Sequence, residues 1–252
     1  MNSTVPPPLV ILHGLFGSGR NWRSVAETLG ASRPVLAPDL PGHGDNPAVL
    51  PADIPGLAEA AAALLERENL PQADVLGHSL GGKAAMWLAL TRPERVRRLV
   101  VVDIAPVAYP DHQAGFLRLL DGLQNLPVDE LRSRSEADAK LAVSIPETNL
   151  RLFLLQNLVH RDGRYAWRMD LARLRTVLPG LIGFPNTEAL SPFPGPALFL
   201  GGARSDYLRP GHGALIHTLF PHAEILHLAD AGHWPHVEQR EAFLTAVQSF
   251  LA

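Results

Sequence analysis

The first half of the chain alternates between short apolar runs and segments with apolar residues at helical spacing. Leu9–Leu12 is a continuous apolar run, whereas Trp22, Val25, Ala26 and Leu29 recur at i, i+3, i+4 and i+7, which marks one face of a helix. This alternation predicts further strands at 34–38, 73–76 and 98–104, with helices around 57–65 and 83–90. Nearly continuous apolar strands separated by helices indicate a parallel sheet covered on both faces.

The pattern changes between about residues 107 and 190, where apolar residues fall at helical spacing and no strand is evident. Helical spacing predicts one helix through Phe116 and Leu123 and another through Leu152, Leu155 and Val159. Strands at 197–202 and 224–228, a helix at 214–219 and a last helix reaching 251 then resume the earlier rhythm.

We therefore predict an α/β fold with a mostly parallel sheet and helices on both faces, built from residues 1–106 and 191–252. Residues 107–190 form a helical cap inserted after the strand that ends at Asp103. Because active sites in such sheets lie at the carboxyl ends of the strands, this position favours a lid over a simple packing elaboration.

One hexapeptide, Gly77-His78-Ser79-Leu80-Gly81-Gly82, carries the strongest functional signal. It matches the nucleophile elbow Gly-x-Ser-x-Gly, in which a strand turns sharply into a helix and exposes the serine at the apex. An apolar run precedes it and a stretch of good helix formers follows it, which is the context that the motif requires. Ser79 is therefore the candidate nucleophile.

A serine needs a base to remove its proton and an acid to orient that base. His233 follows the last predicted strand in a Gly-containing loop and completes the chain order serine, acid, histidine. Two residues qualify as the acid, since Asp103 ends the strand after the elbow helix and Asp206 lies in the turn after the next strand. Metal binding through His233 and His236 is disfavoured, because no carboxylate or cysteine clusters with them.

Acyl transfer also needs donors aimed at the developing oxyanion. We expect the backbone N–H of Leu80, at the start of the elbow helix, to be one donor. The turn His13-Gly14-Leu15 after the first strand should supply the other, through the N–H of Leu15.

Composition narrows the class of protein. The 252 residues are 46% hydrophobic and 19% charged, with a net charge of −3, so no nucleic-acid partner is expected. The chain has no cysteine, which excludes disulfides and thiolate catalysis. No signal peptide and no membrane span are expected, so we predict a cytoplasmic location. We expect no cofactor and no metal.

These residues resemble the α/β-hydrolase superfamily over essentially the whole chain. The matching pieces are 12–18, 39–44, 77–83 and 231–234. Three stretches, 102–106, 154–159 and 162–168, resemble more narrowly the small YbfF-type esterases and their mitochondrial relatives. The resemblance implies hydrolysis of carboxylic esters or acyl thioesters through Ser79, and it favours Asp103 over Asp206 as the acid.

Several alternatives stay open at this point. A perhydrolase, an acyltransferase or a carbon–carbon bond hydrolase would keep the same triad, and a receptor or binding module would use the same fold for recognition alone. The expected partner is a small acyl ester or thioester. The cap offers Phe116, Phe153, Trp167 and Phe184 as pocket walls, although core packing is the simpler role for each. The acyl length and the oligomeric state are not predicted.

Overall fold

The computed structural model describes residues 6–252. The expectation of no signal peptide concerns the N-terminal segment, of which residues 1–5 lie outside the described residues. Its main sheet has six strands, all paired in parallel. In the order in which they lie side by side, the strands are β2 (Val35–Leu36), β1 (Leu9–Leu12), β3 (Ala73–His78), β4 (Val96–Val102), β7 (Ala197–Gly202) and β8 (Ala223–Leu228). The predicted parallel α/β sheet is confirmed.

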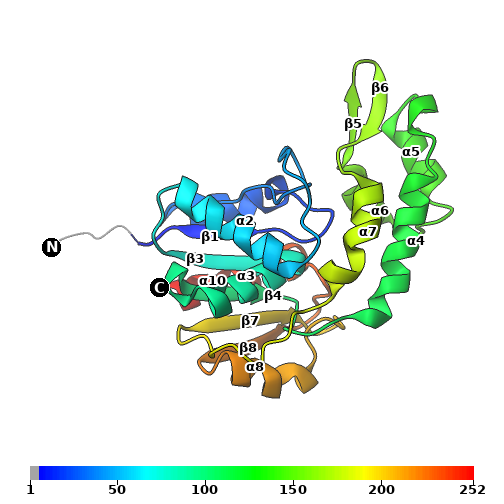
Figure 1. Ribbon diagram of the computed structural model, residues 1–252. Coiled ribbons are helices and arrows are strands. Elements are labelled where there is room, and N and C mark those ends of the chain that lie inside the picture. The colour runs from blue at the N-terminus through cyan, green and yellow to red at the C-terminus, as the bar shows by residue number, and fades with distance from the viewer. Residues whose placement is uncertain (1–5) are drawn as a thin grey trace.

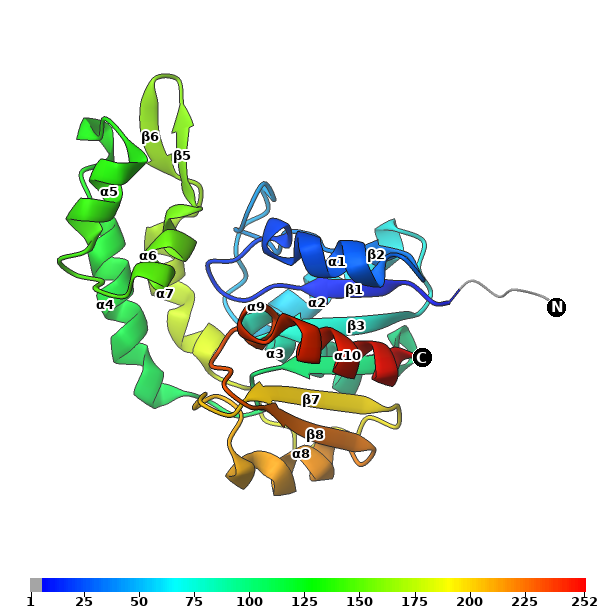
Figure 2. The ribbon, with the colours of Figure 1, turned by 180° about the vertical axis from the view of Figure 1, so that it is seen from behind.

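Helices cover both faces of this sheet because successive strand residues point to opposite sides. Leu9 and Ile11 pack in one apolar cluster with the helices α1 (Arg23–Leu29) and α10 (Arg240–Leu251), which lie in front of the sheet in Figure 2. Val10 and Leu12 belong to the opposite cluster. That cluster includes the helices α2 (Ile54–Arg67), α3 (Leu80–Thr91) and α8 (Gly213–Leu219), and Figure 1 shows the first two in front.

The segment between β4 and β7 leaves the sheet and projects beyond it (Figure 1). Its helices are α4 (Gln113–Gln124), α5 (Arg134–Leu141), α6 (Thr148–Leu155) and α7 (Leu171–Ile182). We call residues 107–190 the cap. The division into a core of residues 1–106 and 191–252 and an inserted cap stays a prediction.

The cap is not entirely helical, so the expectation of no strand there is wrong. The antiparallel strands β5 (Leu158–Arg161) and β6 (Arg164–Trp167) form a hairpin, and the predicted helix through Val159 ends at Leu155. Asp162 and Gly163 join the two strands with φ angles of 50° and 80°. Positive φ at both central residues is what a two-residue hairpin turn of type I′ requires.

The two ends of the cap are fastened together close to the sheet. The backbone N–H of Tyr109 donates to the carbonyl of Ile182 over 3.0 Å. Lys83, on the elbow helix α3, donates to the carbonyls of Ile182 and Gly183 over 2.6 and 2.7 Å. Burial lowers the pKa of Lys83 to about 7, and its amino group lies at the carboxyl end of helix α7. The base of the cap is thus held against α3.

Within residues 6–252, no helix combines the length and the hydropathy that crossing a lipid bilayer requires.

Candidate active site

The predicted site residues lie at the carboxyl edge of the sheet, as parallel topology requires. His78 at the end of β3 pairs in register with Val102 at the end of β4, so Ser79 and Asp103 follow neighbouring strand ends. His233 stands in the loop after β8, between that strand and the short helix α9 (Pro235–Glu238). Residues far apart in the sequence are thereby brought to one edge.

Ser79 has the backbone geometry of a nucleophile elbow. Its φ and ψ are 51° and −115°, and its N–H donates to the carbonyl of Val102 over 3.0 Å. The glycines leave no room for side chains, since a Cβ on Gly81 would stand 2.2 Å from the carbonyl oxygen of Leu12 and one on Gly77 would stand 2.3 Å from the carbonyl oxygen of Gly81. This strained turn can form because the neighbouring residues of the elbow are glycines.

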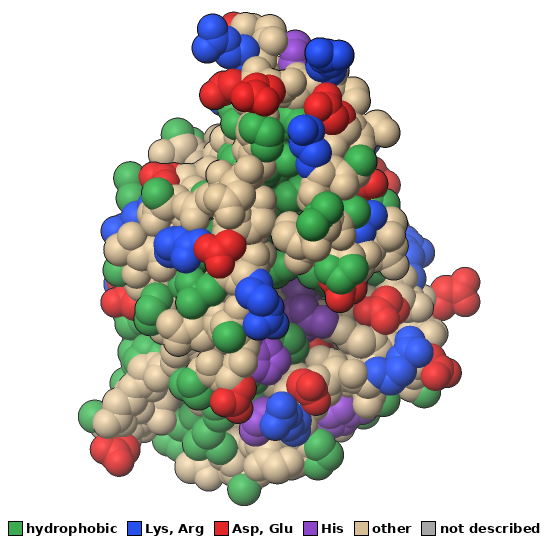
Figure 3. Space-filling model, turned by 90° about the vertical axis from the view of Figure 1, so that its right-hand side faces the viewer, with side chains coloured by type: hydrophobic (Ala, Val, Ile, Leu, Met, Phe, Trp, Pro, Cys, Tyr) green, Lys and Arg blue, Asp and Glu red, His purple; other side chains and the backbone are tan. Residues whose placement is uncertain are grey.

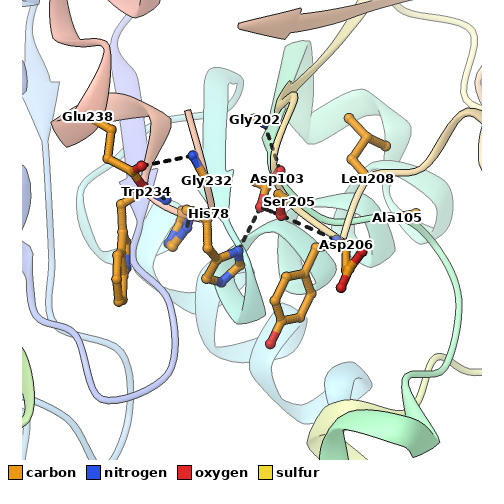
Figure 4. A network of polar contacts seen from close by, with 12 residues as sticks. His78, Asp103, Ala105, Gly202, Ser205, Asp206, Leu208, Gly232, Trp234 and Glu238 are labelled. Atoms are coloured by element: carbon orange, nitrogen blue, oxygen red, sulfur yellow. Dashed lines mark hydrogen bonds and ion pairs between the residues drawn. The ribbon is translucent and has the colours of Figure 1, made fainter. Parts of the chain in front are cut away.

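Asp103 contacts the ring of His233 directly. Nδ1 of His233 and Oδ2 of Asp103 are 2.7 Å apart, and the carboxylate is fully buried. Two further donors fix the carboxylate, the N–H of Gly202 over 2.9 Å to Oδ1 and the hydroxyl of Ser205 over 2.5 Å to Oδ2 (Figure 4). With Nδ1 donating to Asp103, Nε2 of His233 is the nitrogen left to accept a proton.

Asp206, the other candidate acid, lies at the surface. Its side chain is 79% exposed, and its nearest cationic partner is Arg209 at 3.9 Å. Figure 4 shows its carboxylate to one side of Asp103, outside the dashed contacts that converge there. The structure therefore brings Asp103, and not Asp206, to His233.

The ring of His233 is held by its neighbours as well as by the carboxylate. Tyr207 stacks on it with ring centroids 4.0 Å apart and planes tilted by 26°. Glu238 accepts hydrogen bonds from the N–H groups of Gly232 and Trp234 over 2.9 and 3.1 Å, which braces the loop on both sides of His233. His78 donates from Nε2 to the carbonyl of His233 over 2.8 Å.

Ser79 and His233 line the same cavity, of about 230 Å³, at the carboxyl edge. Figure 3 shows histidine side chains gathered around a hollow on this face, below the cap. Leu15 lines this cavity too, and with Leu80 it lines a smaller one that also reaches Ser79. Since the first N–H groups of a helix have no partner within the helix, the Leu80 N–H is available at Ser79.

His13 braces the turn that carries Leu15. Its Nε2 accepts the N–H of Leu40 over 2.9 Å, so Nδ1 carries the proton and donates to the carbonyl of Gly14 over 2.8 Å. Burial, together with the neighbouring His43, lowers the pKa of His13 to about 3. Burial also lowers the pKa of His236, which stacks on Trp22, to about 3. Both rings are therefore neutral parts of the scaffold.

Of the four aromatic residues expected as pocket walls, the structure brings two to the site. Phe116 and Phe153 line the larger cavity. Trp167 instead donates its indole N–H to the carbonyl of Leu123, and Phe184 packs against Trp87.

Three residues near the site were missed by the sequence analysis: Ser205, Tyr207 and Asn157. The first two contact the Asp103–His233 pair, and no motif marked them because they lie in an irregular turn after β7. Asn157 donates to the carbonyl of Phe16 over 2.7 Å, from within the cap stretch 154–159 whose resemblance had been noted. Among residues 6–252, no group of three or more His, Cys, Asp or Glu side chains is arranged to hold a metal ion.

Known proteins match this chain over nearly its full length. A family model described as the alpha/beta hydrolase fold matches residues 7–239. The sn-1-specific diacylglycerol lipase ABHD11 of Mus musculus is 40% identical over 98% of this chain and 81% of its own length. Esterase YbfF of Escherichia coli is 31% identical, over 97% of this chain and 92% of its own.

A solved structure, a marine microorganism esterase, has a TM-score of 0.93 and 32% identity, covering 98% of this chain and 96% of its own. These relatives are thus named as esterases and lipases, and each is matched over 97% or more of this chain. The chain belongs to the α/β-hydrolase family, as a hydrolase of the esterase and lipase type.

Proposed function

We propose that the protein is a serine hydrolase that cleaves carboxylic esters through an acyl-enzyme on Ser79. The observation that carries this proposal is the 2.7 Å contact between His233 and the buried Asp103, in a cavity that Ser79 also lines. In this reading Asp103 holds the imidazole in the tautomer whose Nε2 accepts the serine proton.

The proposed reaction has two steps. Ser79 Oγ attacks the ester carbonyl while His233 takes its proton, and the oxyanion accepts hydrogen bonds from the N–H groups of Leu15 and Leu80. His233 then gives the proton to the departing alcohol, and a water activated by the same ring hydrolyses the acyl-enzyme. Removing one oxyanion donor typically costs ~3 kcal/mol of transition-state stabilisation.

The small-molecule substrate follows from the same reasoning, and the names of the relatives support an ester over other acyl compounds. An acyl thioester stays the second substrate class of the same chemistry.

We also propose that residues 107–190 act as a lid, since Phe116 and Phe153 from the cap line the cavity beside Ser79. The cytoplasmic location stays a prediction from the sequence.

The direct test compares Ser79→Ala with the wild type on an activated short-acyl ester such as p-nitrophenyl acetate. We expect kcat to fall ~10⁴-fold or more, because the nucleophile is lost while the fold is kept. Circular dichroism and the thermal midpoint check folding. Ser24→Ala, at an exposed serine of α1, is the matched control and should keep full activity.

A wild-type protein that neither turns over esters nor reacts with a serine-directed phosphonate would contradict the proposal. That result would favour a binding or receptor module on the same fold.

A further inference from the structure

Two cavities of very different size meet at Ser79. The larger, of about 230 Å³, is lined by Ser79 and His233. The smaller, of about 30 Å³, is lined by Ser79 together with Leu15, Leu80 and Leu181, and His233 is not among its walls. An ester bound at Ser79 has an acyl arm and an alcohol arm on either side of its carbonyl carbon. The two cavities can therefore hold one arm each.

The position of His233 decides the assignment. The leaving alcohol must receive its proton from this ring, so the alcohol arm has to lie on the side that the ring lines. That side is the larger cavity. The acyl arm then points away from His233, into the smaller cavity beside the Leu15 and Leu80 N–H groups.

The smaller cavity has room for about two water-sized groups, at ~10–15 Å³ each. Its walls are fixed by hydrogen bonds. Lys83 is tied to the carbonyls of Ile182 and Gly183, and the Tyr109 hydroxyl donates to the carbonyl of Tyr207 and accepts from the N–H of Ala105. A long chain would have to break these contacts to enter.

The larger cavity is apolar and opens outward. Its walls include Phe16, Leu119, Leu150 and Phe153. It shares Asn21, Phe153, Trp234 and His236 with an outer groove of about 740 Å³. Two large apolar side chains that line this groove are exposed, Leu152 by 53% and Val237 by 65%. Together with Phe153 and Trp234 these side chains give the groove apolar walls that suit a hydrocarbon chain.

We propose that the preferred substrate is an ester of a short acyl group, of about two to four carbons, with a large apolar alcohol. The acyl group occupies the small cavity, and the alcohol runs through the larger cavity into the outer groove. This inference rests on the proposed serine hydrolase activity and specifies its substrate class.

The reaction balances without a further reactant. The Ser79 Oγ–carbonyl carbon bond forms and the bond from that carbon to the alcohol oxygen breaks, with the proton passing through His233 to the alcohol. Water then attacks the short acyl-enzyme and releases the carboxylic acid, which restores the Ser79 hydroxyl.

Two isomeric esters test the assignment on the wild-type protein. Hexyl acetate and ethyl hexanoate have the same composition but exchange the long and short arms. We expect kcat/KM for hexyl acetate to exceed that for ethyl hexanoate at least ~10-fold, since a methylene without room in an apolar pocket costs that factor or more. Equal values, or a preference for ethyl hexanoate, would overturn the inference. Absence of turnover on both esters and of phosphonate labelling would instead overturn the proposed function itself.

A pair of variants tests which cavity holds the acyl arm. Leu181→Ala enlarges the small cavity and should raise the ratio of ethyl hexanoate to hexyl acetate turnover ~5-fold or more. Leu119→Ala, in the wall of the larger cavity, should not raise this ratio. Both substrates are measured on the same preparation, so the ratio does not depend on the fraction folded. Leu181→Val is the milder variant if the first fails to fold.

The opposite result would overturn the inference. If Leu119→Ala raised the ratio of ethyl hexanoate to hexyl acetate turnover and Leu181→Ala left it unchanged, the acyl arm would lie in the larger cavity.

Discussion

Asp103 is the residue whose role depends most on three-dimensional detail. From the sequence, Asp103 and Asp206 both stand beyond strands that end at the same edge, and residue patterns alone left the acid open. The structure separates them because Asp103 turns inward directly after β4, with φ of 50°, whereas Asp206 lies four residues beyond Gly202 on the surface. Turn direction is a backbone property that strand periodicity does not report.

Exchanging each aspartate for its amide tests this separation. We expect Asp103→Asn to lower kcat ~10⁴-fold, the loss known for the amide replacement in the serine protease triad, because the amide no longer fixes the productive tautomer of His233. Asp206→Asn should change kcat less than ~3-fold, since a surface ion pair is weak. The measurement is kcat on p-nitrophenyl acetate, with thermal midpoints for both variants. Similar mild losses in the two variants would contradict Asp103 as the orienting acid.

At the scale of elements, apolar patterning predicted every strand of the main sheet, because the inner strands are mostly apolar and the edge strand β8 keeps Ile225, Leu226 and Leu228. The cap hairpin β5–β6 was not predicted, and the reason is physical. Leu152, Leu155 and Val159 stand at helical spacing by coincidence, since the helix stops at Leu155 and Val159 belongs to β5. The dipeptide Asp162-Gly163 was the available signal, because it suits a two-residue hairpin turn.

Two residues of the cap stretch 154–159 contact the turn that follows β1. Asn157 holds the carbonyl of Phe16, and Gln156 accepts from the amide of Asn21 over 2.5 Å. Phe16 has a φ of 62°, a conformation that a bulky residue rarely adopts, and it follows Leu15 in the proposed oxyanion turn. The cap thus supports the shape of that turn.

This contact can be tested through Asn157→Ala. Without its amide, the buried Phe16 carbonyl loses a partner, which should cost ~1–3 kcal/mol of unfolding free energy. The turn should also relax, so we expect kcat to fall ~10-fold with a smaller change in KM, as fits an interaction used in the transition state. Denaturant unfolding and steady-state kinetics measure the two effects.

Asn125→Ala, at the exposed end of α4, is the control and should change neither quantity. A stability loss in Asn157→Ala with unchanged kcat would mean that the contact supports the fold alone.

At the scale of the whole molecule, the two edges of the sheet differ in charge. At the amino edge, a buried Asp74 is paired with Arg33 and Arg97, each at 2.6 Å. At the carboxyl edge, buried histidines surround the site, and burial lowers the pKa of each below its usual value: His13, His43, His78 and His236. The site is therefore built among neutral rings, which keeps fixed positive charge away from His233.

This arrangement makes stability depend on acid pH. The unfolded chain takes up protons on these rings near pH 6.5, whereas the pKa of His13 and of His236 in the folded protein is about 3. The unfolded state thus binds more protons below pH 6.5, so their contribution is complete above that pH and is lost progressively down to about pH 3. Each ring should remove ~1.4 kcal/mol of unfolding free energy per pH unit in this window.

His236→Phe isolates one of these contributions, because phenylalanine keeps the stacking on Trp22 and cannot take up a proton. Urea unfolding between pH 6.5 and 4 should show a shallower fall than in the wild type, by ~1.4 kcal/mol per pH unit. Phe243→Leu, which alters a ring packed beside His236 without removing a titratable group, should lower stability by the same amount at every pH. If the His236→Phe and wild-type curves ran parallel, His236 would not be the neutral buried ring that its surroundings imply.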